Sequence, residues 1–165
     1  MYYSSIFERA PLKAFTTITT IMKKIVLILF LFSTGLVKAQ DMPISVIGNQ
    51  AAVPAQLSMA DMQNVFMGKM PKWSGGEKVV IALMKLNTDA GKATCSKVYH
   101  MSADEVKKYW LTLSMKGTVD APQFFNTTGE LKDFVAKTKG SIGIIEGSAS
   151  AGFSKTVLVD GKKSF

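Results

Sequence analysis

Residues 78–92 read Lys-Val-Val-Ile-Ala-Leu-Met-Lys-Leu-Asn-Thr-Asp-Ala-Gly-Lys, and this stretch decides the fold. After Lys78, residues 79–84 are all apolar, which is typical of a strand buried on both faces of a sheet. Residues 87–91 are polar or small and end that strand, and a helix is expected from Ala90 onward. A fully buried strand that leads directly into a helix indicates an α/β layered domain.

The rest of the chain extends this pattern in both directions. Short β-branched runs predict three further strands, at 44–48, 141–145 and 155–159. Apolar residues recurring at three- and four-residue spacing predict helices between them. These helices are expected at 58–67, at 90–101, from the cap Ser102 to about Ser114, and from the cap Thr128 to Gly140. We therefore expect one α/β lobe, three-layer-like, with about four strands covered by helices.

The N-terminal quarter has the features of an export signal. Residues 25–32 are an unbroken apolar run, preceded by Met-Lys-Lys at 22–24 and followed by small residues up to Ala39. This order predicts a signal peptide at 22–39 that is cleaved after Ala39. The alternative, a membrane anchor, is less favoured because the run is short for spanning about 30 Å of hydrocarbon. Residues 1–21 precede the signal and are expected to be an over-extended start.

Removing the predicted leader changes the charge arithmetic. The whole chain has 165 residues and a formal charge of +8. Residues 1–39 hold five basic residues and one acid, so the remaining 126 residues carry 15 lysines against 11 acids, a charge of +4, without arginine. This mild excess does not favour nucleic-acid binding, which usually relies on clustered Lys and Arg. Small anions would still be attracted, and the membrane is expected to matter only through the signal peptide.

The sequence offers no catalytic or metal site. His100 is the only histidine, so no histidine cluster can form, and a solvated or helix-end position is expected for it. Gly75-Gly76 lacks the Lys-Ser/Thr of a phosphate loop. Cys95 is the only cysteine and falls in a predicted helix, where a small buried side chain is favoured over a reactive thiol. We expect a protein that is not an enzyme and needs no cofactor or metal.

The strand–turn–helix at 85–92 is the one constellation that suggests a site. Ligands of α/β sheets lie beyond the carboxyl ends of strands, and a helix N-terminus there offers N–H groups to an anion. Thr88 could donate its hydroxyl, and Lys85 or Lys92 could add positive charge. The alternative is an ordinary turn in which the carboxylate of Asp89 caps the helix and occupies those donors.

Three ordered motifs resemble a known family. Residues 57–76 contain Phe-Met-Gly-Lys and then Trp-Ser-Gly-Gly, similar to the Phe-x-Gly-Lys and Trp-x-x-Gly of phosphate-type substrate-binding proteins of ABC transporters. Residues 108–122 contain Lys-Tyr-Trp, Lys-Gly and Pro in the order that family uses, and residues 140–144 resemble its Gly-x-Ile-Gly-Tyr. With the strand and turn between them, these matches span roughly 44–147.

The resemblance implies a type II periplasmic binding protein fold, export to the periplasm and an oxyanion ligand. The family places an arginine and a Ser-Gly-Thr run on phosphate at the position of 85–92. Here 90–92 stand at that run, and a lysine or an asparagine lies closest to the missing arginine. The candidate anion-binding residues are Lys85, Asn87, Thr88, Ala90, Gly91, Lys92 and Thr94.

Family members usually run to about twice the length that remains here, so the chain resembles a single-lobe short form. Two functions stay open. One is binding of phosphate or a related oxyanion for an ABC permease, alone or with a second lobe or a second copy. The other is a periplasmic protein-interaction module that docks through Trp73, Phe124, Phe125 or the helix at 58–67.

Overall fold

A computed structural model describes residues 42–117, 119–147 and 154–165. The predicted signal peptide at 22–39 and the start expected to be over-extended, residues 1–21, lie outside the described residues. Within the described part, no helix is both long enough and apolar enough to span a membrane.

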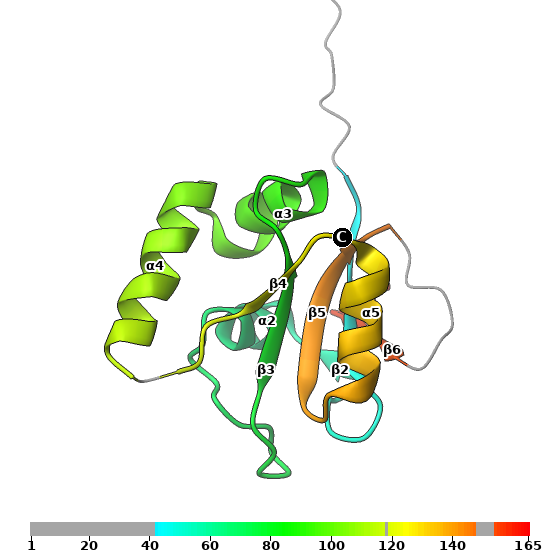
Figure 1. Cartoon of the computed structure of the whole chain (residues 1–165). Helices are drawn as coiled ribbons and strands as arrows, with labels where there is room; N and C mark the ends of the chain where they lie inside the picture. The colour runs from blue at the N-terminus through cyan, green and yellow to red at the C-terminus, as the bar shows by residue number, and fades with distance from the viewer. Residues whose placement is uncertain (1–41, 118, 148–153) are drawn as a thin grey trace, which may run out of the picture. The chain divides into compact units, whose positions relative to one another are not determined.

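The strands form a mixed sheet with the order β2-β6-β1-β5-β3-β4 (Figure 1). Its strands are β1 (Ile44–Asn49), β2 (Gln56–Leu57), β3 (Val80–Met84), β4 (Gln123–Phe125), β5 (Ser141–Glu146) and β6 (Ser154–Val159). The helices are α2 (Met59–Phe66), α3 (Asp89–Thr94), the π-helix η1 (Cys95–Tyr99), α4 (Ala103–Met115) and α5 (Thr128–Lys137). Strand β3 runs parallel to β4 and β5, whereas β1 runs antiparallel to β5 and β6.

The four strands expected from the sequence are confirmed, and two short edge strands were missed. β2 has two residues and β4 has three, and both lie in segments expected to be loops. Such short strands are too brief to show an alternating pattern. The expected continuous helix at 90–101 is instead a short α-helix followed by a π-helical turn.

Capping boxes mark the starts of α4 and α5. Ser102 accepts from the Glu105 amide, and the Glu105 carboxylate accepts in return from the Ser102 amide, which makes a capping box. α5 has the same arrangement, but its cap is Thr127 rather than the expected Thr128. The hydroxyl of Thr127 accepts from the amide of Glu130, an acid at the third helical position, and this pairing fixes the start one residue earlier.

The central strands are buried on both faces, and successive side chains alternate between two apolar clusters. On β5, Ile142 and Ile144 face the cluster that contains α2, η1 and α4. Ile145 faces the other cluster, where Leu131 and Val135 of α5 cover the sheet. α5 lies along β5 in Figure 1. Helices thus cover both faces, which confirms the three-layer-like α/β lobe.

Buried polar groups on the α2 and α4 side are hydrogen-bonded to one another. The hydroxyl of Tyr99 donates to the carbonyl of Phe66 at 2.8 Å and accepts from the indole of Trp110 at 3.1 Å. Burial raises the pKa of the Tyr99 phenol, so it stays protonated. Burial likewise raises the pKa of the Cys95 thiol, which confirms that Cys95 is a small buried side chain rather than a reactive group.

Trp73 and one face of α2, both considered for partner docking, belong to the core instead. Trp73 is 4% exposed, and its indole N–H donates to the carbonyl of Gly140 at 2.8 Å. On α2, the buried side chains are Met62, Val65 and Phe66. These residues fill the core as most large apolar side chains do, so neither Trp73 nor the buried face of α2 offers a docking surface.

We expect Gly140→Ala to destabilise the protein by about 2 kcal/mol or more. Gly140 has φ +77°, and a Cβ there would overlap the carbonyl oxygen of Lys78. Chemical denaturation should reveal the loss. Gly75→Ala is the matched control, because a Cβ at Gly75 meets nothing within 4 Å. Equal stability of the two variants would contradict this account of the Gly140 turn.

Candidate functional site

The candidate site is the turn between β3 and α3, beyond the carboxyl end of β3. The amide of Lys85 donates to the carbonyl of Phe125 at 3.0 Å, which ties the end of β3 to the edge strand β4. The amide of Thr88 donates back to the carbonyl of Lys85 at 2.9 Å and closes the turn. Leu86 is buried between them, whereas Lys85 and Asn87 are exposed. The turn therefore directs its polar side chains outward at one end of the sheet.

Thr88, not Asp89, caps helix α3, which corrects the alternative considered from the sequence. The hydroxyl of Thr88 accepts from the Gly91 amide at 3.1 Å and donates to the carbonyl of Lys85 at 2.7 Å. Its only hydrogen is thus engaged within the turn. Asp89 is the first helical residue and lies 3.5 Å from the ammonium of Lys92 in an exposed ion pair. The helical hydrogen bonds leave the amides of Asp89 and Ala90 without an intrahelical acceptor.

Three of the candidate residues pack the turn rather than face solvent. A Cβ at Gly91 would overlap the carbonyl oxygen of Lys85, so only glycine allows α3 to approach the end of β3 this closely. Ala90 is buried in the cluster beneath α5. The hydroxyl of Thr94 is buried and donates to the carbonyl of Ala90 at 2.8 Å. These residues shape the site, and their contact with a ligand stays a prediction.

Lys85 and Asn87 line a hollow of about 420 Å³ together with Leu86, Lys107 and Phe124. We call this space the turn hollow. Lys107 comes from α4 and Phe124 from β4, so three separate segments line this open hollow. Lys92, the remaining candidate, is exposed but does not line it. The structure thus brings together two of the predicted residues and adds Lys107 and Phe124.

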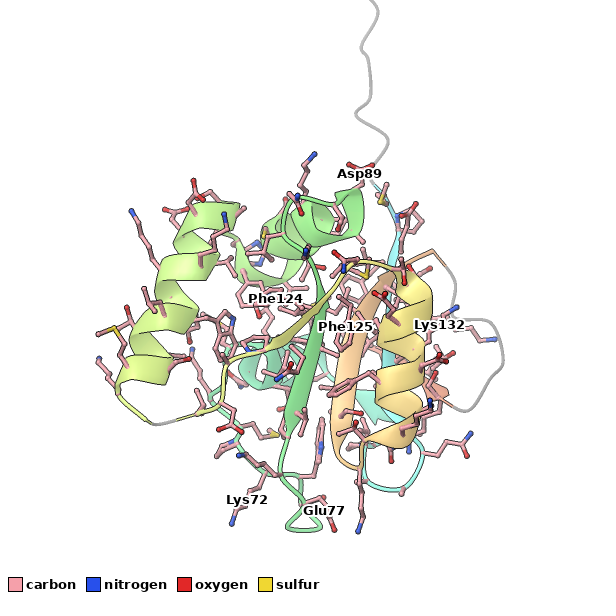
Figure 2. The ribbon with its side chains drawn as sticks, in the orientation of Figure 1. Lys72, Glu77, Asp89, Phe124, Phe125 and Lys132 are labelled. Carbon is pink, nitrogen blue, oxygen red and sulfur yellow. The ribbon has the colours of Figure 1, made fainter. Side chains whose placement is uncertain are left out.

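Lys107 was missed because nothing in its local sequence relates it to the turn. It lies on the exposed side of an amphipathic helix, where a lysine usually serves only solubility. The sequence suggests Phe124 only as a docking residue. Its neighbour Phe125 points to the opposite side of β4, where its ring lies 5.0 Å from that of Phe134. Figure 2 shows Phe124 towards α4 and Phe125 towards α5.

The turn hollow carries positive charge at its rim. Lys85 and Lys107 each contribute an ammonium group, and Asn87 adds an amide that can donate or accept. Lys107 also lies 3.1 Å from the carboxylate of Asp104, but both groups are mostly exposed, so this pair contributes little. The arrangement can hold an anion by charge and hydrogen bonding, and it presents no nucleophile with a neighbouring base.

The expectation for His100 is confirmed. It is exposed at the end of η1, and its Nε2 lies 3.1 Å from the side-chain amide nitrogen of Gln63. Among residues 42–117, 119–147 and 154–165, no three His, Cys, Asp or Glu side chains are grouped so that they could hold a metal ion.

No protein-family model matches the chain, and no curated protein matches it. Solved structures do. A candidate phosphate ABC transporter substrate-binding protein with bound phosphate from Clostridium perfringens has a TM-score of 0.56 and 16% identity, over 74% of this chain and 47% of that one. An ABC-type phosphate transport receptor from Vibrio cholerae has a TM-score of 0.58 and 10% identity, over 76% of this chain and 50% of that one.

PstS from Borrelia burgdorferi is similar in the same way, with a TM-score of 0.53 and 11% identity over 73% of this chain and 49% of that one. The chain therefore spans about half the length of each of these structures. At such low identity the likeness is one of fold. The described chain has the α/β fold of a single lobe of the type II periplasmic binding proteins, as the sequence motifs implied.

Proposed function

We propose that this chain is an exported solute-binding protein that holds phosphate or a related oxyanion in the turn hollow, for delivery to an ABC transporter. The observation that carries the proposal is a positively rimmed hollow at the carboxyl end of β3, in a lobe whose solved structural neighbours include one described with bound phosphate. Ligands of open α/β sheets lie at this end of the strands.

The chemistry of the rim determines how an anion would be held. The ammonium groups of Lys85 and Lys107 act as point charges, and the amide of Asn87 donates a hydrogen bond. Arginine, which would add planar bidentate donors, is absent from residues 40–165. The lysines are exposed and remain hydrated, so their attraction is screened. We therefore expect readily reversible binding of inorganic phosphate, with a Kd of about 1 mM, equivalent to about −4 kcal/mol.

The length of the chain affects which partners are expected. The chain spans about half of each neighbour, so a second lobe, a second copy of this chain or the permease itself would complete the enclosure of the ligand. Export rests on the signal peptide expected at 22–39, and a periplasmic location follows from that expectation. A binding role also agrees with a site that carries no catalytic pair, so we propose that the protein is not an enzyme.

One observation favours the second candidate function, a protein-interaction module. Three large apolar side chains are exposed among the described residues: Leu111 at 62%, Met115 at 80% and Phe124 at 41%. They lie on α4 and β4. However, Trp73 and the buried face of α2 belong to the core, so most of the docking surface expected for an interaction module is not exposed.

We expect phosphate at millimolar concentration to raise the melting temperature of the full chain. The double variant Lys85→Gln with Lys107→Gln should lose the shift, because it removes both charges from the rim. Lys137→Gln with Lys162→Gln removes the same charge from residues that do not line the hollow, and it should keep the shift. Differential scanning fluorimetry checks both. The proposal fails if neither phosphate, sulfate nor another oxyanion shifts the unmodified protein.

We expect Thr88→Ala to lower the free energy of unfolding by about 1 kcal/mol, because it removes the cap of α3. Phosphate affinity should change less than twofold, since the Thr88 hydroxyl already donates to the Lys85 carbonyl. Denaturation and calorimetric titration measure the two effects separately, and Thr88→Ser should restore stability. A tenfold loss of affinity at unchanged stability would instead assign the hydroxyl to the ligand.

A further inference from the structure

The turn hollow is larger than a bare oxyanion requires. Its volume is about 420 Å³. A tetrahedral oxyanion has five heavy atoms and would take at most about 150 Å³, even if each atom needed the roughly 30 Å³ of a water molecule. Pockets of about 300–1,000 Å³ are those that enclose organic ligands. The space left beside a phosphate at the rim is enough for a ring or a short alkyl chain.

The hollow also has an apolar wall. The ring of Phe124 is 41% exposed, although it lies on a strand beside α4. Successive residues of β4 face opposite sides, and Phe125 uses the opposite side to pack against Phe134. Phe124 is therefore held by the strand with part of its ring open to the hollow, and the buried Leu86 is the second apolar residue of the lining. A ligand with an aromatic or alkyl group would bind more tightly by covering that ring, because apolar surface is then removed from water.

Two lysines also line the hollow. Lys85 precedes the turn and Lys107 lies on α4, and both line the same hollow as Phe124, so the hollow offers lysine charge to an anionic group and an aromatic ring to an apolar substituent. This pattern, mostly apolar lining with a few polar groups that fix orientation, is the general form of a small-molecule pocket.

We propose that the preferred ligand of the turn hollow is an organic phosphate, an aryl or alkyl monoester, rather than inorganic phosphate. The phosphoryl group lies at Lys85 and Lys107, and the apolar group packs on Phe124. This inference rests on the proposed anion-binding function and names the class of ligand for the same site.

Isothermal titration calorimetry of the full chain with phenyl phosphate, inorganic phosphate and phenol tests it. We expect phenyl phosphate to bind at least tenfold more tightly than inorganic phosphate, and phenol alone to give no measurable binding. Phe124→Ala should bring the phenyl phosphate affinity down to that of inorganic phosphate and leave the latter unchanged. Met115→Ala is the control, because Met115 is also an exposed apolar residue but lies outside the hollow, and it should keep the preference.

The outcomes separate the two proposals. Equal affinity for phenyl phosphate and inorganic phosphate overturns the organic-ligand inference and leaves the anion-binding function standing. Absence of binding by both anions overturns the inference, and the proposed function falls with it if sulfate and other oxyanions also fail to bind. A preference for phenyl phosphate that survives Phe124→Ala, or is lost in Met115→Ala, overturns the placement of the apolar group. Phenol binding as tightly as phenyl phosphate overturns the role of the two lysines.

Discussion

Strands β1 and β5 are buried on both faces, and the position of every other element follows from that constraint. All residues of β1 are buried, as are all of β5 except Glu146. Backbone polar groups in such strands must be paired within the sheet, and side chains on both faces must be covered. The sheet therefore has β3 and β6 as neighbours of this central pair, α2, η1 and α4 over one face and α5 over the other. A helix on only one face would leave Ile145 and Ile47, or else Ile142 and Ile144, in water.

The same constraint positions the candidate site. Strand β3 pairs with β5 and is buried, so its carboxyl end is fixed in place. A few contacts then suffice to hold the turn that follows it. Gly91 allows α3 to lie against the carbonyl of Lys85, and the Thr88 hydroxyl bridges strand and helix. Lys85 and Asn87 are then directed towards the space beside α4. A rigid scaffold with an exposed polar turn is the common arrangement of binding sites on α/β folds.

Much of this could be predicted from the sequence, and the reasons for the rest are physical. The apolar run at 79–84 and the short runs near 44 and 141 predict central strands, because a strand that is buried on both faces must be apolar at nearly every position. β4 was missed because three residues on an edge show no periodicity. Asp and Thr are both good caps, so the sequence leaves Asp89 open as the cap, and the bond that the Thr88 hydroxyl accepts from the Gly91 amide decides for Thr88. Lys107 joins the hollow through tertiary packing, which one helix alone cannot reveal.

We propose that a single lobe already contains an anion-binding half-site at the end of β3. Two-dimensional amide NMR of the full chain during a phosphate titration tests it most directly, because each backbone amide reports its own surroundings. We predict that the largest shifts fall in the turn at 85–89 and at Lys107 and Phe124, while the amides of the β2–β6 edge stay unchanged. Saturable shifts centred elsewhere, or uniform small shifts that follow ionic strength alone, would contradict the account.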